Sequence, residues 1–304
     1  MRALISGASG LIGSALERRL RASSWSTVRL VRAPAAGDAA SIVWDPAVGF
    51  NRPTDAEGFD LIVHLAGENI AGGRWTAARK QRILESRVQG TRRLCETLAR
   101  LEHRPRALLC ASAIGIYGDR GDELLDEQSA PGRGFLAEVC QQWEAATAPA
   151  RDAGVRVVNL RFGVVLSKDG GALAKMLLPF RLGLGGRIGN GRQYMSWIAL
   201  DDVVRAIEWT AAHDALSGPV NIVAPNPVIN REFTRELGRA LGRPTIFPLP
   251  AFAARAALGE MARELLLASQ RVAPARLAAA GFSFSFPQLG PALRHVLGKE
   301  QTAA

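Results

Sequence analysis

The sequence predicts an α/β fold: a Rossmann-type, doubly wound parallel sheet with a smaller C-terminal α/β lobe. Strand-like apolar runs alternate with helix-periodic segments up to about residue 166, and this alternation is typical of a parallel sheet covered by helices on both faces. The chain also opens with an apolar run, a glycine-rich turn and a helical pattern, the usual first unit of such a sheet. A chain of 304 residues that is 48% hydrophobic can form one large domain or two unequal ones.

The N-terminal turn is the feature around which the prediction is built. Apolar residues 3–5 lead into Gly7-x-x-Gly10-x-x-Gly13, and leucines then recur at helical spacing over residues 11–20. Gly7 allows a sharp turn, Gly10 lets the backbone approach a pyrophosphate, and Gly13 lets the helix lie against the strand. A glycine pattern alone can be a simple tight turn, but at the start of an α/β pattern it favours a dinucleotide. The turn residues assigned to cofactor binding are Gly7, Ser9, Gly10, Leu11, Ile12 and Gly13.

The second expected strand, residues 27–31, indicates which dinucleotide binds. It ends at Arg32, where an acidic residue that binds the adenosine ribose of NAD would be expected. Arg29 and Arg32 instead make this rim cationic, which suits the 2′-phosphate of NADP. The alternative is that both arginines are ordinary solvated charges at a strand end.

The other elements expected in this half of the chain continue the alternation. Strands are expected at residues 41–44, 60–67, 106–111 and 155–160, and helices at residues 75–101 and 135–151. In a doubly wound sheet the loops after the parallel strands meet the cofactor. Gly67, at the end of one such strand, is therefore assigned to the cofactor site.

The pattern changes beyond residue 166. Five glycines crowd residues 183–191 and suggest a mobile loop that lines the site. Strands are expected at 196–198 and 220–223. Helices are expected at 203–212, with Asp201 and Asp202 as its cap, at 231–241 and over 251–280. We expect a Rossmann domain at residues 1–166, to which 195–225 return, and a smaller substrate-side lobe made of 167–194 and 226–304.

The cysteines and the hydropathy pattern suggest a cytoplasmic protein. Cys95, Cys110 and Cys140 are widely spaced and form no CxxC pair, which favours reduced core residues over disulfides or a metal site. The N-terminus has the pattern of a strand and not of a signal peptide. No apolar run approaches the roughly 20 residues of a membrane span. We expect no metal and no membrane partner.

The charge of the chain raises the question of a nucleic-acid partner. It carries 38 Lys and Arg against 28 Asp and Glu, a formal net charge of +10. Nucleic-acid binding needs basic residues gathered on one surface. Here the arginines are spread over every segment beside acidic residues, so we expect no nucleic-acid partner.

Further motifs connect the chain to a known family. They are Gly7-x-x-Gly10-x-x-Gly13, His64-Leu65-Ala66-Gly67-Glu68-Asn69, Ser112-Ala113-x-Gly115-x-Tyr117-Gly118, Trp143-Glu144, Arg161-x-Gly163-Val164-Val165-Leu166 and Leu177-Leu178-Pro179-Phe180-x-Leu182-Gly183-Leu184-Gly185-Gly186. With them the chain resembles, over nearly its whole length, the atypical short-chain dehydrogenase/reductases labelled "epimerase family protein", which are related to the extended nucleotide-sugar epimerases. The C-terminal lobe is similar to that family's small domain.

This resemblance implies NADP(H) as the cofactor and adds residues to its site. It implies Arg32 on the 2′-phosphate, in agreement with the reasoning from the strand end. It implies Leu65 and Ala66 along the path of the adenosine and nicotinamide riboses, Arg87 near the phosphates, and Val165 beside the nicotinamide.

The chain departs from the active extended enzymes at the proton relay. Those enzymes resemble one another in a Ser or Thr four residues before the first Tyr-Gly and in a Tyr-x-x-x-Lys motif, whose lysine lowers the pKa of the tyrosine. Here Ala113 stands at the first position, and alignment on Glu144 places Leu136 and Cys140 at the other two. Ser112 and Tyr117 are the nearest hydroxyls for a substitute acid. The alternative is that both only stabilise the strand end.

The function expected from the sequence is that of an NADP(H)-dependent oxidoreductase or epimerase acting on an unidentified small molecule. The substrate would lie between the sheet and the small lobe. The alternative is a non-catalytic NADP(H)-binding sensor or regulatory protein. The sequence leaves an oligomer possible.

Overall fold

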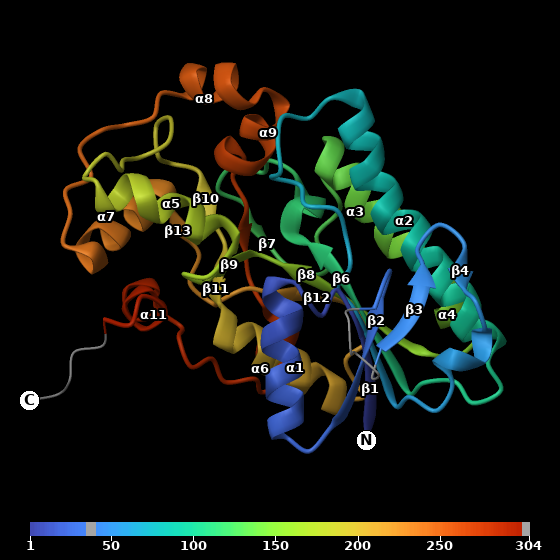
Figure 1. The fold of residues 1–304 in the computed structure, drawn as a ribbon. Helices are drawn as coiled ribbons and strands as arrows, with labels where there is room; N and C mark the ends of the chain where they lie inside the picture. The colour runs from blue at the N-terminus through green and yellow to red at the C-terminus, as the bar shows by residue number, and fades with distance from the viewer. Residues whose placement is uncertain (35–40, 300–304) are drawn as a thin grey trace, which may run out of the picture.

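The computed structural model of this protein describes residues 1–34 and 41–299 and contains a large, mainly parallel sheet (Figure 1). The strand order is β12-β8-β6-β5-β1-β2-β3-β4, and within it only the β3–β4 pair is antiparallel. The bounds are β1 (Arg2–Ser6), β2 (Ser26–Val31), β3 (Ser41–Asp45), β4 (Gly49–Phe50), β5 (Leu61–His64), β6 (Ala107–Ala113), β8 (Arg156–Phe162) and β12 (Gly218–Ile222). The predicted fold class is confirmed, and the strand order reverses at β1, where ligands bind in such sheets.

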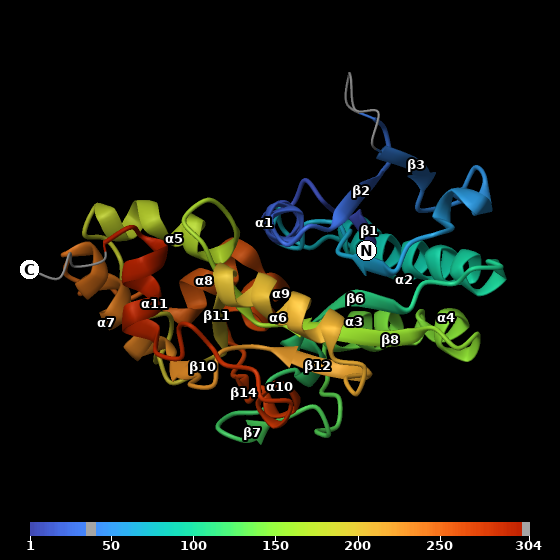
Figure 2. The same ribbon diagram turned by 90° about the horizontal axis from the view of Figure 1, so that it is seen from below.

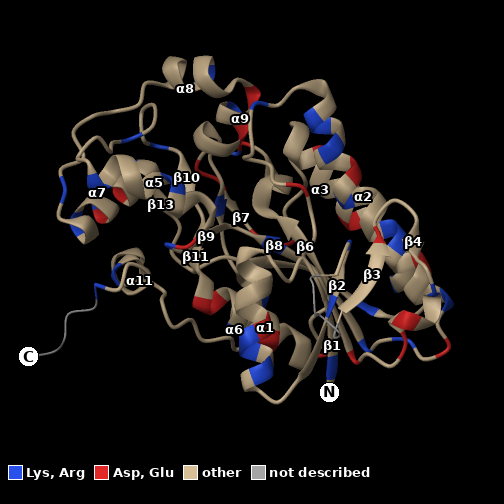
Figure 3. Ribbon diagram, in the orientation of Figure 1, with Lys and Arg blue, Asp and Glu red and all other residues tan. Residues whose placement is uncertain are grey.

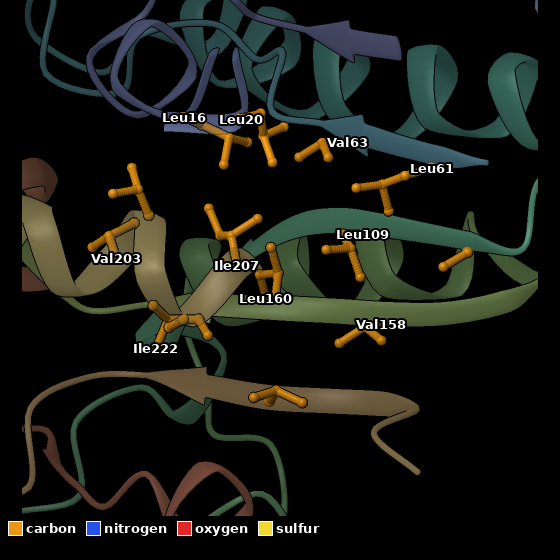
Figure 4. Packing of buried hydrophobic residues seen from close by; sticks show 14 of the residues in the cluster. Leu16, Leu20, Leu61, Val63, Leu109, Val158, Leu160, Val203, Ile207 and Ile222 are labelled. Carbon is orange, nitrogen blue, oxygen red and sulfur yellow. The ribbon is translucent and has the colours of Figure 1, made fainter. Parts of the chain in front are cut away.

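Helices cover both faces of the sheet. On one face lie α1 (Leu11–Ala22) and α6 (Leu200–Ala212), and on the other lie α2 (Ala77–Arg100), α3 (Phe135–Ala145) and α4 (Ala148–Asp152). Figure 4 shows Leu16 and Ile207 from the first face packed with Leu160 of the sheet. The other face is filled by α2 side chains and by Trp143. Burial of both faces explains why the central strands are almost wholly apolar.

A second group of elements lies to one side of the sheet, on the left in Figures 1 and 2. It contains α5 (Gly171–Arg181), α7 (Asn230–Leu241) and α11 (Leu289–Val296), with the short strands β9 (Val164–Leu166), β10 (Tyr194–Met195), β11 (Trp197–Ala199) and β13 (Val228–Ile229). These helices share a separate apolar core, in which Phe180, Phe233 and Leu293 are buried.

The remaining short elements join this group to the sheet. They are α8 (Ala251–Leu258), α9 (Glu260–Ala262), a π-helical turn (Arg263–Leu267), β7 (Leu124–Leu125), β14 (Arg271–Val272) and α10 (Ala275–Ala279). β14 pairs with β7, from the loop that follows β6. Leu277 and Phe282 pack in the same core as α1 and α6. We propose the division into a Rossmann domain and a smaller lobe given above. This packing suggests that residues 271–284 belong to the sheet domain.

Three local expectations were wrong. The helix predicted over 135–151 is divided into α3 and α4, and Pro149, which has no N–H to donate, lies in the first turn of α4. Neither Asp201 nor Asp202 caps α6, whose N-cap is Ala199. The Asp202 carboxylate instead accepts hydrogen bonds from the backbone N–H groups of Ser285 (2.8 Å) and Phe286 (2.9 Å). The helices expected over 251–280 are interrupted by the strand β14, and helix α11 was not predicted. Asp202 therefore fixes the segment that leads into α11.

The charges are distributed as the sequence suggested. Figure 3 shows Lys and Arg on α1, α2, α7 and many connecting segments, interspersed with Asp and Glu. Several of these arginines form ion pairs with acidic residues on the same helix, for example Arg93 with Glu96 and Arg239 with Glu236. In the part of the chain that the structure describes, no helix is long and apolar enough to cross a membrane.

Candidate functional site

The glycine turn connects β1 to α1 at the carboxyl end of the sheet. Gly7 has a φ of +71°, which favours glycine, and a Cβ at Gly7 would lie 2.8 Å from the carbonyl carbon of Leu65. A Cβ at Gly13 would overlap with the carbonyl oxygen of Gly7, whereas one at Gly10 would lie 3.2 Å from that oxygen. Gly7 and Gly13 are therefore required by the packing of the turn itself. Gly10 is less constrained and faces outward.

The start of α1 is open to an anionic ligand. Its N-cap, Gly10, provides no side-chain hydrogen bond, and the first turn carries no acidic residue. The N–H groups of Leu11 and Ile12 make no hydrogen bond to another described residue and carry the positive end of the helix dipole. Ser9, just before them, is exposed. Anions bind at such a helix N-terminus.

Ser6 joins the end of β5 to the end of β1. Its hydroxyl accepts hydrogen bonds from the N–H groups of Leu65 (3.2 Å) and Ala66 (3.3 Å) and lies 2.6 Å from Nδ1 of His64. His64 is completely buried, and burial lowers its pKa to about 4, so the imidazole is neutral at pH 7. The loop that contains Leu65 and Ala66 is thus fixed beside the glycine turn.

Arg87 provides a cation at this end of the sheet. A Cβ at Gly67 would lie 3.3 Å from Cζ of Arg87, so the guanidinium rests directly on the Gly67 backbone. Cζ of Arg87 also lies 5.0 Å from the ring centre of Trp143, and Nη1 donates a hydrogen bond to the carbonyl oxygen of Ile83 at 3.2 Å. Burial lowers the pKa of Arg87, and within residues 1–34 and 41–299 no carboxylate forms an ion pair with it. Its positive charge is available to a bound anion.

Arg29 in β2 and Arg32, just after it, have different surroundings. Arg29 donates hydrogen bonds to both carboxylate oxygens of Glu17 on α1, at 2.9–3.0 Å. Arg32, at the carboxyl end of β2, is exposed and forms no ion pair with any residue that the structure describes. The cationic rim expected from both arginines is therefore provided by Arg32, because Arg29 is held by Glu17.

Val165 belongs to β9, whose following loop returns to α1. A Cβ at Gly171 would lie 3.4 Å from Leu11 and 3.5 Å from the carbonyl oxygen of Val165. The structure therefore places Val165 close to the N-terminus of α1. The predicted cofactor residues thus lie at β9, after the carboxyl ends of β1, β2 and β5, and at the start of α1, with Arg87 in the middle of α2.

The other half of this end of the sheet carries a hydrogen-bonded ladder. Ser112, Arg161 and Asn221 are direct neighbours across β6, β8 and β12. Ser112 Oγ donates to Glu144 at 2.7 Å, and Arg161 donates to both oxygens of Glu144, each at 2.8 Å. The Arg161 and Glu144 side chains are only 8% and 13% exposed. We call Ser112, Tyr117, Glu144, Arg161 and Asn221 the polar ladder.

Tyr117 completes the polar ladder. Its hydroxyl donates to Oδ1 of Asn221 at 2.8 Å and accepts from Arg161 at 2.9 Å, and the residue is completely buried. Burial raises the pKa of Tyr117. The hydroxyls predicted as catalytic, on Ser112 and Tyr117, are thus both directed into the protein. This geometry favours the alternative that they stabilise the strand ends.

Leu136 and Cys140 of α3 face the turn that follows β6. A Cβ at Gly115 would lie 3.3 Å from Cβ of Leu136 and 3.9 Å from Sγ of Cys140. Burial raises the pKa of the Cys140 thiol to about 12. Neither side chain can act as an acid or as a cation at pH 7.

A cavity of 270 Å³ lies beside Leu136, between the sheet and the C-terminal lobe. Its lining residues are Gly115, Gly118, Asp119, Arg133, Gly134, Leu136, Arg263, Glu264, Ala268 and Gln270. None of residues 183–191, the expected lining loop, takes part. That loop packs instead on the segment around Leu249, to whose carbonyl oxygen Gly189 donates at 2.9 Å.

Glu264 is the residue of this cavity that sequence reasoning missed most clearly. Its carboxylate accepts hydrogen bonds from the N–H groups of Phe135 (2.9 Å) and Leu136 (2.8 Å), at the start of α3. No local pattern around Glu264 indicates this, because the contact spans 128 residues of chain. In residues 1–34 and 41–299, no three His, Cys, Asp or Glu side chains are grouped so as to hold a metal.

Comparison with known proteins defines the family. Residues 3–223 match the model of the NAD dependent epimerase/dehydratase family. The chain belongs to this family. Residues 249–296 match a domain of unknown function, DUF1731. The resemblance inferred from the motifs is thereby confirmed.

Relatives resemble the chain over almost its full length. It is 47% identical to "Epimerase family protein ML0860" of Mycobacterium leprae over 292 residues, which cover 96% of this chain and 94% of that protein. Among solved structures, human epimerase family protein SDR39U1, crystallised with NADPH, is 35% identical with a TM-score of 0.90, over 98% of this chain and 99% of that one. A protein from Corynebacterium glutamicum described as a nucleoside-diphosphate sugar epimerase is 38% identical with a TM-score of 0.83, over 100% of this chain and 59% of that one.

Proposed function

We propose that this protein binds NADP(H) at the glycine turn and acts as an oxidoreductase or epimerase on a small molecule. The observation that carries the proposal is the open N-terminus of α1, whose first N–H groups lack a partner among the described residues, together with Arg87, whose charge no described carboxylate pairs. The human relative, which shares 35% of its sequence, was crystallised with NADPH. When bound, the cofactor would supply or accept a hydride.

Each predicted cofactor residue has a role in this proposal. The turn from Gly7 to Gly13, with Ser9, Leu11 and Ile12, would hold the pyrophosphate, and Arg87 would neutralise part of its charge. Leu65, Ala66 and Gly67 would line the riboses. Val165 would lie against the nicotinamide.

Arg32 would select NADPH over NADH. A charged hydrogen bond between an arginine and a phosphate contributes on the order of 1.5–3 kcal/mol, or about tenfold to a hundredfold in affinity. Titration of the protein with NADPH and with NADH, followed by nicotinamide fluorescence, tests this. We expect the preference for NADPH to disappear in Arg32→Ala and to persist in Arg100→Ala, a control at the far end of α2. Equal affinities in the parent protein would contradict the proposal.

The source of a proton is a separate question. Ser112 and Tyr117 remain the catalytic residues proposed from the sequence, but their hydrogen bonds within the polar ladder support a structural role. A substrate hydroxyl or a water in the cavity would then supply the proton. General acid assistance typically contributes about 10²–10⁴ in rate, so we expect slow turnover of ordinary nucleotide sugars.

The closed polar ladder also supports the second candidate function, a sensor that binds NADP(H) without turnover. NADPH oxidation measured against a panel of carbonyl compounds separates the two functions. Turnover of any member supports an enzyme, whereas tight NADPH binding without turnover supports the sensor.

A further inference from the structure

We propose that the 270 Å³ cavity binds a small anionic substrate, whose carboxylate or phosphate group lies between Arg133 and Arg263. The inference rests on the proposed function, because it names the class of molecule brought to the cofactor. It differs from what the family name suggests, since a nucleotide sugar is much larger.

The two arginines reach the cavity from different parts of the fold. Arg133 lies at the end of the loop between β6 and α3, and Arg263 begins the π-helical turn of the C-terminal lobe. The backbone of Arg133 is fixed by Gly118, which has a φ of +63° and at which a Cβ would lie 2.7 Å from the Arg133 carbonyl oxygen. Arg133 and Arg263 therefore line the same cavity, one from the loop after β6 and the other from the C-terminal lobe.

The other polar side chains of the cavity are already hydrogen-bonded to the backbone. Asp119 accepts from the N–H of Ser269 at 3.0 Å. Glu264 accepts from two N–H groups at the start of α3, as described above. Gln270 donates to the carbonyl oxygen of Gly118 at 3.1 Å. Each of these three side chains thus already has a hydrogen bond within the protein.

The guanidinium groups of Arg133 and Arg263 make no such hydrogen bond to a described residue. Arg133 is exposed and forms no ion pair with any described residue. The carboxylates nearest to Arg263 are those of Glu264 at 3.7 Å and Glu260 at 3.8 Å, both longer than a hydrogen bond. A carboxylate or phosphate accepts the paired N–H groups of arginine in a fixed geometry that a neutral carbonyl cannot match. The donors available in the cavity therefore favour an anion.

The volume and the apolar lining of the cavity limit the part of the substrate beyond its anionic group. Sites for drug-sized ligands typically have about 300–1,000 Å³, so 270 Å³ suits a short carbon skeleton and not a nucleotide. Leu136 and Ala268 contribute apolar side chains to the lining, against which such a skeleton would pack. A small oxo acid, hydroxy acid or phosphorylated carbonyl compound fits both conditions.

The test compares charged and neutral partners of equal skeleton on the NADPH-saturated protein. Pyruvate is paired with methyl pyruvate, and dihydroxyacetone phosphate with dihydroxyacetone, while UDP-glucose serves as a large anion. Binding is followed by calorimetry, and turnover by NADPH oxidation. The two pairs distinguish a carboxylate from a phosphate as the preferred anion.

We expect at least one of the small anions to bind about tenfold or more tightly than its neutral partner. Arg133→Gln and Arg263→Gln should each remove most of that difference, without changing the affinity for NADPH, and Arg100→Gln should leave it intact. UDP-glucose should not compete with the small anion.

Three results would overturn the inference while leaving the proposed function standing. They are equal binding of both members of each pair, binding that is insensitive to both arginines, and failure of every small anion to bind the NADPH-saturated protein. Failure of NADPH itself to bind would instead overturn the proposed function.

Discussion

The two halves of the carboxyl end of the sheet differ in how their polar groups are used. At β1, β2 and β5, the first N–H groups of α1 and the side chain of Arg32 have no partner among the described residues, and Arg87 has no ion-pair partner there. At β6, β8 and β12, the polar ladder pairs a carboxylate, a guanidinium and two hydroxyls with one another. The first half has N–H donors and positive charge available to a ligand, whereas the polar groups of the second half are hydrogen-bonded to one another.

This difference suggests that one half serves cofactor binding and the other serves stability. A buried group that already has its hydrogen-bond partners gains little from a ligand, whereas an unpaired donor gains a full charged hydrogen bond. We therefore expect changes in the polar ladder to affect stability and changes at the glycine turn to affect NADPH binding.

The largest effect is expected from Arg161→Met. Loss of this guanidinium leaves Glu144 without its bidentate partner in a largely buried position, and breaking such a pair typically costs about 3–5 kcal/mol. Urea unfolding should report this loss, while the folded protein keeps its NADPH affinity. In the double variant Glu144→Gln with Arg161→Met, part of the stability should return. An NADPH affinity that falls in step with stability would show that the two halves are not separate.

The next largest effect is expected from His64, the last residue of β5. Its pKa is lowered to about 4 in the folded protein, from 6.5, so the unfolded chain binds a proton more readily. Stability should therefore decrease as the pH falls from about 6.5 to about 4, by on the order of 3 kcal/mol, and this contribution should be complete above pH 6.5. Urea unfolding of the parent and of His64→Gln between pH 7 and pH 4 measures the difference. An equal pH dependence in both proteins would exclude His64 as its source.

Two substitutions in the glycine turn separate its role in packing from its role in cofactor binding. Gly13→Ala places a methyl group onto the Gly7 carbonyl oxygen, and overpacking of this kind typically costs about 1–3 kcal/mol. Gly10→Ala places its methyl group 3.2 Å from the same oxygen, where a small shift accommodates it. Both variants should bind NADPH poorly, but only Gly13→Ala should show a clearly lower melting temperature. Normal NADPH binding by Gly10→Ala would place the pyrophosphate elsewhere.

The smallest effects are expected from the hydroxyls of the polar ladder. Tyr117→Phe leaves Asn221 and one Arg161 donor with one partner fewer, and Ser112→Ala removes a single hydrogen bond to Glu144. We expect losses of about 1–3 kcal/mol for Tyr117→Phe and about 1 kcal/mol for Ser112→Ala. On any carbonyl compound that the parent reduces, turnover of both folded variants should be close to that of the parent. If Tyr117→Phe lowered turnover at unchanged cofactor affinity, Tyr117 would be a proton donor after all.

Local patterns were sufficient to predict the sheet and the glycine turn. The turn depends on residues within one strand-to-helix unit, so Gly7, Gly10 and Gly13 could be interpreted without knowledge of the rest of the chain. The alternation of apolar runs likewise determined the parallel strands. Helix ends were less predictable, as the division between α3 and α4 shows.

The partners of polar side chains could not be predicted in this way. Arg29 and Arg32 are equivalent in sequence, but only the packing of α1 shows that Glu17 holds Arg29. The motif around Tyr117 suggests a substitute acid, but its hydroxyl donates to Asn221, which is 104 residues away in the chain. Glu264 was missed for the same reason. Such contacts depend on tertiary structure, which no sequence window contains.

A crystal structure of this protein with NADP⁺ bound would test the separation of the two halves most directly. We expect the pyrophosphate at the N–H groups of Leu11 and Ile12, the 2′-phosphate at Arg32, and C4 of the nicotinamide facing the cavity beside Leu136. The Tyr117 hydroxyl should keep its hydrogen bond to Asn221. A cofactor bound away from the glycine turn, or a Tyr117 hydroxyl turned toward the nicotinamide, would contradict this account.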